Sequence, residues 1–132
     1  MSVIADTHAV IWFMLDPARL SAKAWEAMRE ALRGEGRVLI SAVTLVEITY
    51  LVERARLSED ASTRLWEAIR SPEPQVEVVP VDEAVAEAVQ RIPRDVVPDM
   101  PDRIIAATAL HLNLPLVTCD GKIRSSSVPT IW

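Results

Sequence analysis

The sequence has 132 residues, half of them hydrophobic and one of them cysteine, with a formal net charge of −5. This length favours a single domain over residues 1–132, and the hydrophobic content excludes a disordered chain. One cysteine excludes an internal disulfide, and neither a signal peptide nor a run of 18 apolar residues is present. We therefore expect a cytoplasmic protein that does not bind a membrane. The acidic balance argues against nucleic-acid binding through a broad basic surface.

Apolar strands alternate with helical segments along the whole chain. In chain order, we expect a strand at Val3–Ala5, a helix at His8–Leu15, a helix capped by Ser21 and ending near Arg33, a strand at Val38–Ile40, a helix at Val43–Arg54, a helix capped by Ser58 and ending near Arg70, a strand at Val76–Val79, a helix at Asp82–Arg91, a proline-marked loop at Pro93–Pro101, a helix at Asp102–His111, and strands at Leu116–Thr118 and Thr130–Trp132. This alternation predicts βαβ units, and hence an α/β sandwich around a mainly parallel sheet.

Two of these helices are too apolar for ordinary surface helices. The segments His8–Leu15 and Val43–Val52 contain few polar residues on any side. A helix that is apolar all round is either central or covered by a partner. We therefore expect a homodimer or a tightly bound protein partner, contacted by four large side chains left uncovered: Trp12, Phe13, Tyr50 and Leu51.

Four carboxylates stand out by their positions. Asp6 and Asp120 each directly follow or nearly follow a predicted strand, and ligands of open parallel sheets gather beyond the carboxyl ends of the strands. Glu47 is the only charged residue between Ser41 and Glu53, and Asp102 opens the alanine-rich helix.

Each carboxylate also has a structural interpretation. Asp6 could be a helix N-cap, Thr44 and Glu47 fit a capping box, Asp102 suits a helix start after proline, and Asp120 fits a turn before glycine. Capping does not explain why two acids both follow strand ends. Nor does it explain a glutamate inside an apolar helix, since a buried carboxylate needs a cation or a donor.

Carboxylates clustered without histidine or cysteine favour Mg²⁺ or Mn²⁺. Such a site suits hydrolysis of a phosphodiester bond by a metal-activated water. His8 and His111 are isolated, and no cation near Cys119 marks it as a nucleophile.

The four acidic blocks together resemble the PIN-domain ribonucleases, and among them the VapC-type toxins of type II toxin–antitoxin systems. The resemblance rests on VIADTHAVIW, SAVTLVEI, PDRIIAATAL and LPLVTCDGKI, in this order. It implies a PIN-like, Rossmann-like three-layer α/β/α sandwich that is usually dimeric. It also implies Mg²⁺- or Mn²⁺-dependent cleavage of RNA.

Carried over by position, the resemblance makes Asp6, Glu47 and Asp102 the core metal ligands and catalytic acids. Asp120 is the fourth acid, acting directly or through water. Thr118 matches a hydroxyl residue that the family often has near the metal, and Asp99 matches a more variable acidic position. A toxin of this kind implies an antitoxin partner, and we expect that partner to place an arginine or lysine among the acids.

Other classes fit the sequence less well. A receiver-like regulatory domain would show paired acids after its first strand and a lysine after its last, whereas Asp6 has no acidic neighbour. A phosphatase of the haloacid-dehalogenase type would show Asp-x-Asp where this chain has Asp6, Thr7 and His8. A stand-alone PIN nuclease without an antitoxin stays open, and loss of catalysis is disfavoured because all four acids are present.

Overall fold

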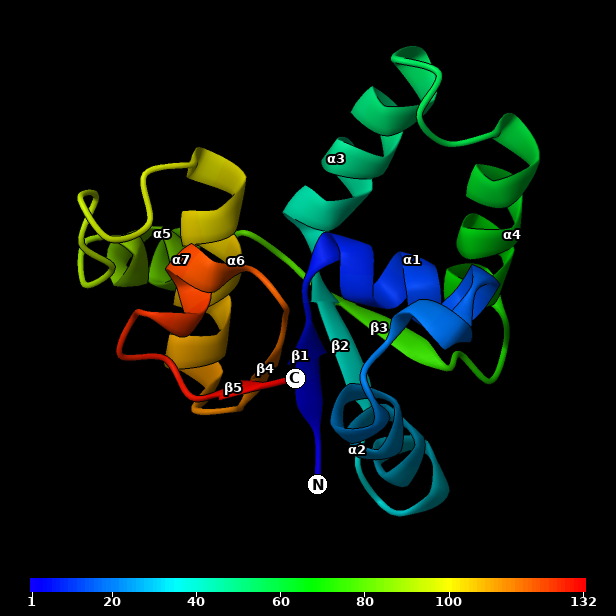
Figure 1. Ribbon diagram of the computed structural model, residues 1–132, viewed down its shortest axis with the longest axis horizontal. Helices are drawn as coiled ribbons and strands as arrows, with labels where there is room; N and C mark the ends of the chain where they lie inside the picture. Colours follow the sequence, from blue (N-terminus) through cyan, green and yellow to red (C-terminus); the bar gives the residue numbers. More distant parts are fainter.

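Five parallel strands form the centre of the molecule, in the order β3–β2–β1–β4–β5 (Figure 1). The computed structural model describes all residues from Met1 to Trp132. The strands are β1 (Val3–Ala5), β2 (Val38–Ser41), β3 (Val76–Val79), β4 (Leu116–Val117) and β5 (Thr130–Ile131). Every neighbouring pair is parallel, with Ile4 of β1 in register with Leu39 of β2 and Leu116 of β4. The predicted parallel α/β sheet is therefore confirmed.

Eight helical segments connect these strands. They are α1 (Thr7–Leu15), the 3₁₀ helix η1 (Pro17–Arg19), α2 (Ala22–Arg33), α3 (Ala42–Glu53), α4 (Glu59–Arg70), α5 (Glu83–Val89), α6 (Met100–Leu112) and α7 (Gly121–Arg124). The two short segments η1 and α7 were not predicted. The start predicted for α6 was two residues late, because Asp99 rather than Asp102 caps this helix and Pro101 lies in its first turn.

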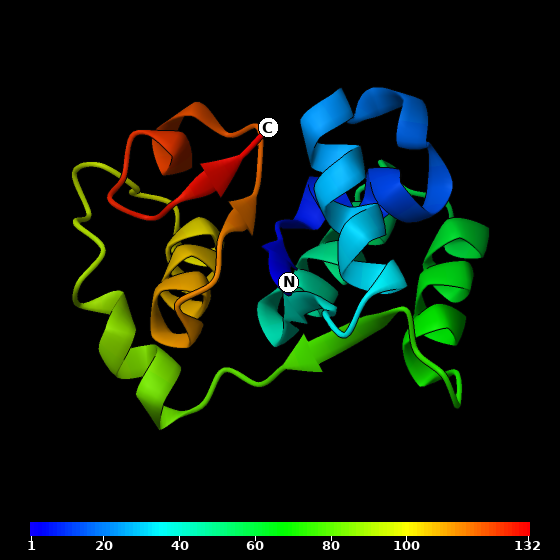
Figure 2. The same cartoon turned by 90° about the horizontal axis from the view of Figure 1, so that it is seen from below.

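The helices cover both faces of the sheet and make a three-layer sandwich. On one face, Val3 and Ala5 of β1 join a core with residues of α1 and α2. On the other face, Ile4 joins a core formed mainly by α5, α6 and α7. Figure 2 shows these two groups of helices on either side of the strands. This alternation follows from the strand geometry, in which successive side chains point to opposite faces.

The connections leave β1 and β4 in opposite directions, and these two strands are neighbours. After β1 the chain passes to β2, and after β4 it passes to β5 on the other side. A sheet of this kind has a crevice at the carboxyl ends of the two strands where the order reverses, and ligands bind there. Asp6 follows β1, and Thr118 and Asp120 follow β4, so the topology brings these three residues to one place.

Candidate active site

Asp6 is held at the carboxyl end of β1 by two hydrogen bonds. As the N-cap of α1, its Oδ1 accepts from the backbone N–H of Ala9 at 2.8 Å. The hydroxyl of Thr118 donates to its Oδ2. Only 8% of the residue is exposed. The capping interpretation of Asp6 is therefore correct, and it leaves the carboxylate aimed at the carboxyl edge of the sheet.

Glu47 lies in the second turn of α3, half-buried. The N-cap of α3 is Ser41, whose hydroxyl accepts from the N–H of Val43 at 3.1 Å, so the capping-box interpretation of Thr44 and Glu47 is wrong. The hydroxyl of Thr7 donates to Glu47 Oε1 at 2.6 Å and lies 3.1 Å from the Thr44 hydroxyl. The donor that a buried glutamate requires is therefore Thr7.

Asp102 and Asp99 lie one turn apart at the start of α6. Asp99 is the N-cap and accepts from the backbone N–H of Asp102 at 3.4 Å. The side chain of Asp102 accepts no hydrogen bond and is half-buried in the first turn. The carboxylate of Asp102 is thus left without a hydrogen-bond donor from the protein.

Asp120 is the N-cap of α7, with Oδ1 accepting from the N–H groups of Lys122 and Ile123 at 2.9 and 3.0 Å. Its own N–H donates to the hydroxyl of Thr118 at 3.0 Å. Thr118 is fully buried and so connects Asp6 with Asp120. The threonine predicted to lie near the site therefore positions two of its acids.

One groove of about 680 Å³ gathers all these carboxylates: Asp6, Glu47, Asp99, Asp102 and Asp120. Thr7, His8 and Cys119 also line it. The acids come from the carboxyl ends of β1 and β4 and from the first two turns of α3 and α6. In Figure 1, α3 and the start of α6 lie on the two sides of the end of β1. The structure thus brings together every acid proposed from the sequence.

The crowding of these acids changes their proton affinity. Burial, and then the charges of Asp120, Asp99, Glu47 and Asp6, raise the pKa of Asp102 from 3.8 to about 7. Burial also raises the pKa of Asp6 and of Glu47, against the hydrogen bonds from Thr118 and Thr7. No lysine or arginine forms an ion pair with any of them, since the one ion pair in the molecule joins Arg37 and Glu77. The site therefore holds more negative charge than the protein neutralises.

The donor set fits a hard divalent cation. Carboxylate and hydroxyl oxygens are the ligands that Mg²⁺ and Mn²⁺ prefer. Every buried side-chain nitrogen and oxygen has a hydrogen-bond partner. The match to a cation therefore rests on the oxygen ligands and on the negative charge that the protein does not compensate. No three of these groups surround one point closely enough to share an ion as they stand.

Sequence reasoning missed three residues of this groove. Thr7 follows Asp6 directly, and its small polar side chain at a strand–helix junction was the available signal. Arg19 and Arg56 also line the groove but lie 37 positions apart in connections that show no motif.

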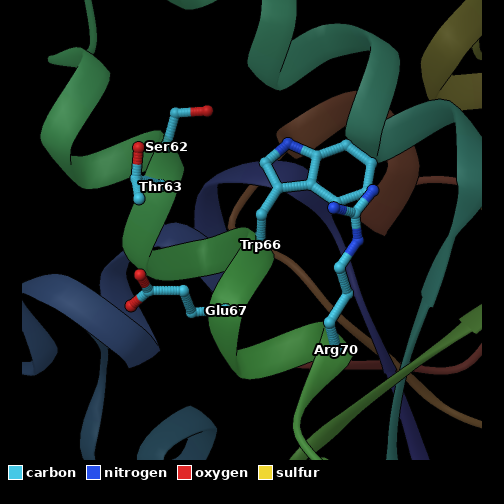
Figure 3. Close-up of a pocket in the computed structure, with 5 residues that line it drawn as sticks. All are labelled: Ser62, Thr63, Trp66, Glu67 and Arg70. Carbon is cyan, nitrogen blue, oxygen red and sulfur yellow. The ribbon is translucent and has the colours of Figure 1, made fainter.

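A second hollow, of about 460 Å³, lies on the outer side of α4 (Figure 3). All of its lining residues come from that one helix and Arg70 stacks on Trp66, so it gathers no comparable chemistry.

The chain belongs to the PIN-domain family, whose model matches residues 3–127. A similar protein is Ribonuclease VapC22 from Mycobacterium tuberculosis, which is 28% identical over 134 residues, covering 99% of this chain and 98% of that protein. The resemblance to PIN domains, and among them to VapC proteins, is therefore confirmed.

Solved structures with the same fold include two complexes. A chain of VapBC2 from Rickettsia felis, bound to a DNA fragment from its promoter, superposes with a TM-score of 0.74 at 15% identity, covering 98% of this chain and 97% of that one. A chain of a toxin–antitoxin complex from Klebsiella pneumoniae gives 0.69 at 20% identity, covering 99% and 97%. These matches confirm the predicted PIN-like sandwich. The structure also contains no helix with the length and apolar character needed to cross a membrane.

Proposed function

We propose that this protein is an endoribonuclease that depends on Mg²⁺ or Mn²⁺ and acts in the cytoplasm as the toxin of a toxin–antitoxin pair. The observation that carries this proposal is the convergence of five carboxylates in one groove at the reversal point of a PIN-domain sheet. The similarity to a ribonuclease along nearly the whole chain supports RNA as the substrate.

Asp6, Glu47 and Asp102 would hold the cation, with Asp120 contributing directly or through water. Thr118 orients Asp6, and Thr7 orients Glu47, through the hydrogen bonds described above. Bound at these oxygens, Mg²⁺ or Mn²⁺ supplies activation of a water and neutralisation of phosphate charge. The protein's part is to present the oxygens and hold the RNA.

The test measures activity and metal binding separately. Wild-type protein should cleave single-stranded RNA only with added Mg²⁺ or Mn²⁺, and EDTA should abolish cleavage. Metal should also raise the melting temperature, since a ligand that binds only the folded state stabilises it. Both effects should disappear in Asp6→Asn and Asp102→Asn and persist in Asp60→Asn, an exposed acid of α4 outside the groove. Cleavage at full rate in EDTA would contradict the metal mechanism.

The partner proposal rests on the neighbouring structures and on exposed apolar side chains. The neighbours are chains of toxin–antitoxin complexes, which supports an antitoxin for this chain. Tyr50 and Val46 of α3 are each 54% exposed, which supports a homodimer. The prediction that Trp12, Phe13 and Leu51 are also uncovered is only partly correct, because all three are half-buried in intramolecular packing.

An antitoxin should be encoded by a small neighbouring gene. Its product should co-purify with this protein and inhibit cleavage, with an arginine or lysine that compensates the charge of the acids. Active protein that retains no such partner would instead be a stand-alone PIN nuclease.

A further inference from the structure

The acidic groove continues past the carboxylates into a region of different character. Its walls beyond the acids are apolar and come from α1, α3 and the connection between α3 and α4: Ile11, Trp12, Leu15, Leu51 and Leu57. At the rim of the same groove lie two exposed arginines, Arg19 and Arg56. In Figure 1, α3, its connection to α4, and α4 arch over α1, and these helices contact one another. One continuous surface thus leads from the five carboxylates to two arginines, with Asp16 near Arg19.

Arg19 is held in place by aromatic packing. It ends η1, and its guanidinium carbon lies 4.6 Å from the centroid of the Trp12 ring. Trp12 is in turn packed against Trp132, with ring centroids 5.9 Å apart. A guanidinium over an aromatic face keeps its N–H donors free at the edge. Arg19 is therefore a fixed cation with donors available to a ligand.

Arg56 is held in place by the turn that ends α3. Its backbone N–H donates to the carbonyl of Leu51 at 2.8 Å, and that of Ala55 donates to the carbonyl of Val52 at 3.0 Å. This is a Schellman motif, and it places Ala55 in the left-handed region with φ 56°. The motif fixes the backbone of Arg56 beside Leu51, and both residues line the groove.

Neither arginine is neutralised by the protein. The one ion pair of the molecule joins Arg37 and Glu77 on another surface, although Asp16 lies in the groove with Arg19. The five acids repel a phosphate backbone, and the whole chain is acidic. Affinity for a polyanion must therefore come from cations near the acids, and arginine binds phosphate through two parallel N–H groups.

We propose that Arg19 and Arg56 bind phosphates of a single-stranded RNA next to the one that is cleaved, so that the strand runs along this groove to the acids. This proposal rests on the proposed ribonuclease function. Two anchored phosphates would hold the scissile phosphate at the carboxylates, where charge alone would repel it. The apolar walls suit unpaired bases, whose flat faces pack on apolar and aromatic side chains of single-strand channels.

The test is RNA binding in EDTA, where no cleavage interferes. The anisotropy of a fluorescent single-stranded RNA gives Kd at several salt concentrations for wild type and for the Arg19→Gln, Arg56→Gln double variant. Each lost phosphate contact lowers the slope of log affinity against log salt by about 0.7 for a single strand, so the double variant should lose about 1.4. Its Kd should rise at least about tenfold at low salt, since a charge-assisted contact contributes that much.

Three controls make the result specific. Arg33→Gln removes an exposed arginine at the end of α2, outside the groove, and should change neither Kd nor cleavage. The Arg19→Lys, Arg56→Lys double variant keeps the charges and should keep most of the salt slope. Melting temperatures should differ only slightly, since both side chains are exposed and the cation–π contact of Arg19 with Trp12, at an exposed site, contributes little to stability.

The outcomes separate this proposal from the ribonuclease proposal. If wild type cleaves RNA and the double glutamine variant matches it in Kd, salt slope and kcat/KM, the RNA path is wrong and the nuclease function stands. If wild type never cleaves but its RNA binding depends on both arginines, their phosphate contacts stand and the nuclease function fails. If the variant no longer binds an antitoxin while its RNA binding is unchanged, the groove is a protein-binding site and the proposal is overturned.

Discussion

At the scale of single residues, the same carboxylates serve the fold and the candidate site. Asp6, Asp99 and Asp120 each cap a helix by accepting backbone N–H groups. A capped carboxylate is fixed in direction at a helix start, where the helix dipole favours its charge. Capping is thus the means by which the chain points acids at the groove. The structure confirms the cap at Asp6, and this cap leaves the second carboxylate oxygen beside Thr118 in the groove, so capping does not exclude the proposed ligand role.

The raised pKa of Asp102 makes the stability of metal-free protein depend on pH. Between pH 3.8 and about 7 the folded state binds more protons at this group than the unfolded state. The free energy of unfolding should therefore fall as pH rises through this window. The stability that the protonated form of Asp102 contributes is fully lost above pH 7. Asp102→Asn should melt higher than wild type at pH 8 in EDTA, with a smaller difference at pH 5. Asp60→Asn controls for removal of any single charge.

Melting of Asp102→Asn well below wild type at pH 8 would show that Asp102 is a structural residue. Saturating Mg²⁺ or Mn²⁺ should reverse the order, because a cation stabilises the ionised acids of the wild type and not the variant.

Thr7 should matter through Glu47. Thr7→Val keeps the shape of the side chain and removes the donor to Glu47 Oε1, 2.6 Å away. A part-buried acceptor that loses its donor costs about 1–3 kcal/mol, so the variant should melt lower and kcat/KM should fall roughly tenfold or more. Thr7→Ser restores the hydroxyl and should restore most of both. Equal loss in the serine variant, which keeps the hydroxyl, would show that the hydrogen bond to Glu47 is not what the valine variant loses.

At the scale of elements, the helix ends decide where side chains of the groove lie. Ser21, Ser41, Ser58 and Asp82 cap α2, α3, α4 and α5 with side-chain oxygens. Such caps are readable from sequence, and the starts predicted from Ser21 and Ser58 are confirmed. The cap at Ser41 shifts Glu47 into the second turn of α3, where it reaches Thr7 rather than its own N-terminus.

Ala55 identifies a position where glycine should stabilise the protein. Its φ of 56° is unfavourable for a residue with a Cβ by about 1 kcal/mol. Ala55→Gly removes this strain but loosens the unfolded chain, so the melting temperature should stay equal or rise. The matched control is Ala86→Gly, at an exposed site inside α5, which should lose about 1 kcal/mol. Equal destabilisation of both variants would mean that the left-handed turn does not persist in solution.

At the scale of the whole molecule, the order of the strands assembles the site. The sheet could be predicted because apolar runs mark strands, and the meeting of Asp6 and Asp120 because acids after parallel strands meet at one edge. Glu47 and Asp102 were indicated by a charge inside an apolar helix and by an acid at a helix start. The short segments η1 and α7 could not, since three or four residues carry too little periodicity. The basic end of the groove was hidden for a related reason. Arg19 and Arg56 come to line one groove only through the packing of α1, α3 and α4, which depends on tertiary contacts.

The last prediction concerns association of two copies of the chain. Val46 and Tyr50 lie one turn apart on α3 and are each 54% exposed, beside the groove that Glu47 enters from the same helix. Large apolar side chains at the centre of an interface supply much of its binding energy, and a charge placed there is unpaired and desolvated. Tyr50→Glu should therefore raise the dimer Kd at least roughly thirtyfold, a loss of about 2 kcal/mol. Light scattering over a dilution series measures this Kd, with Val81→Glu, at an exposed apolar residue outside α3, as the matched control.

A wild-type protein that is monomeric at all concentrations would contradict the dimer. Dissociation by Val81→Glu alone would place the interface away from α3.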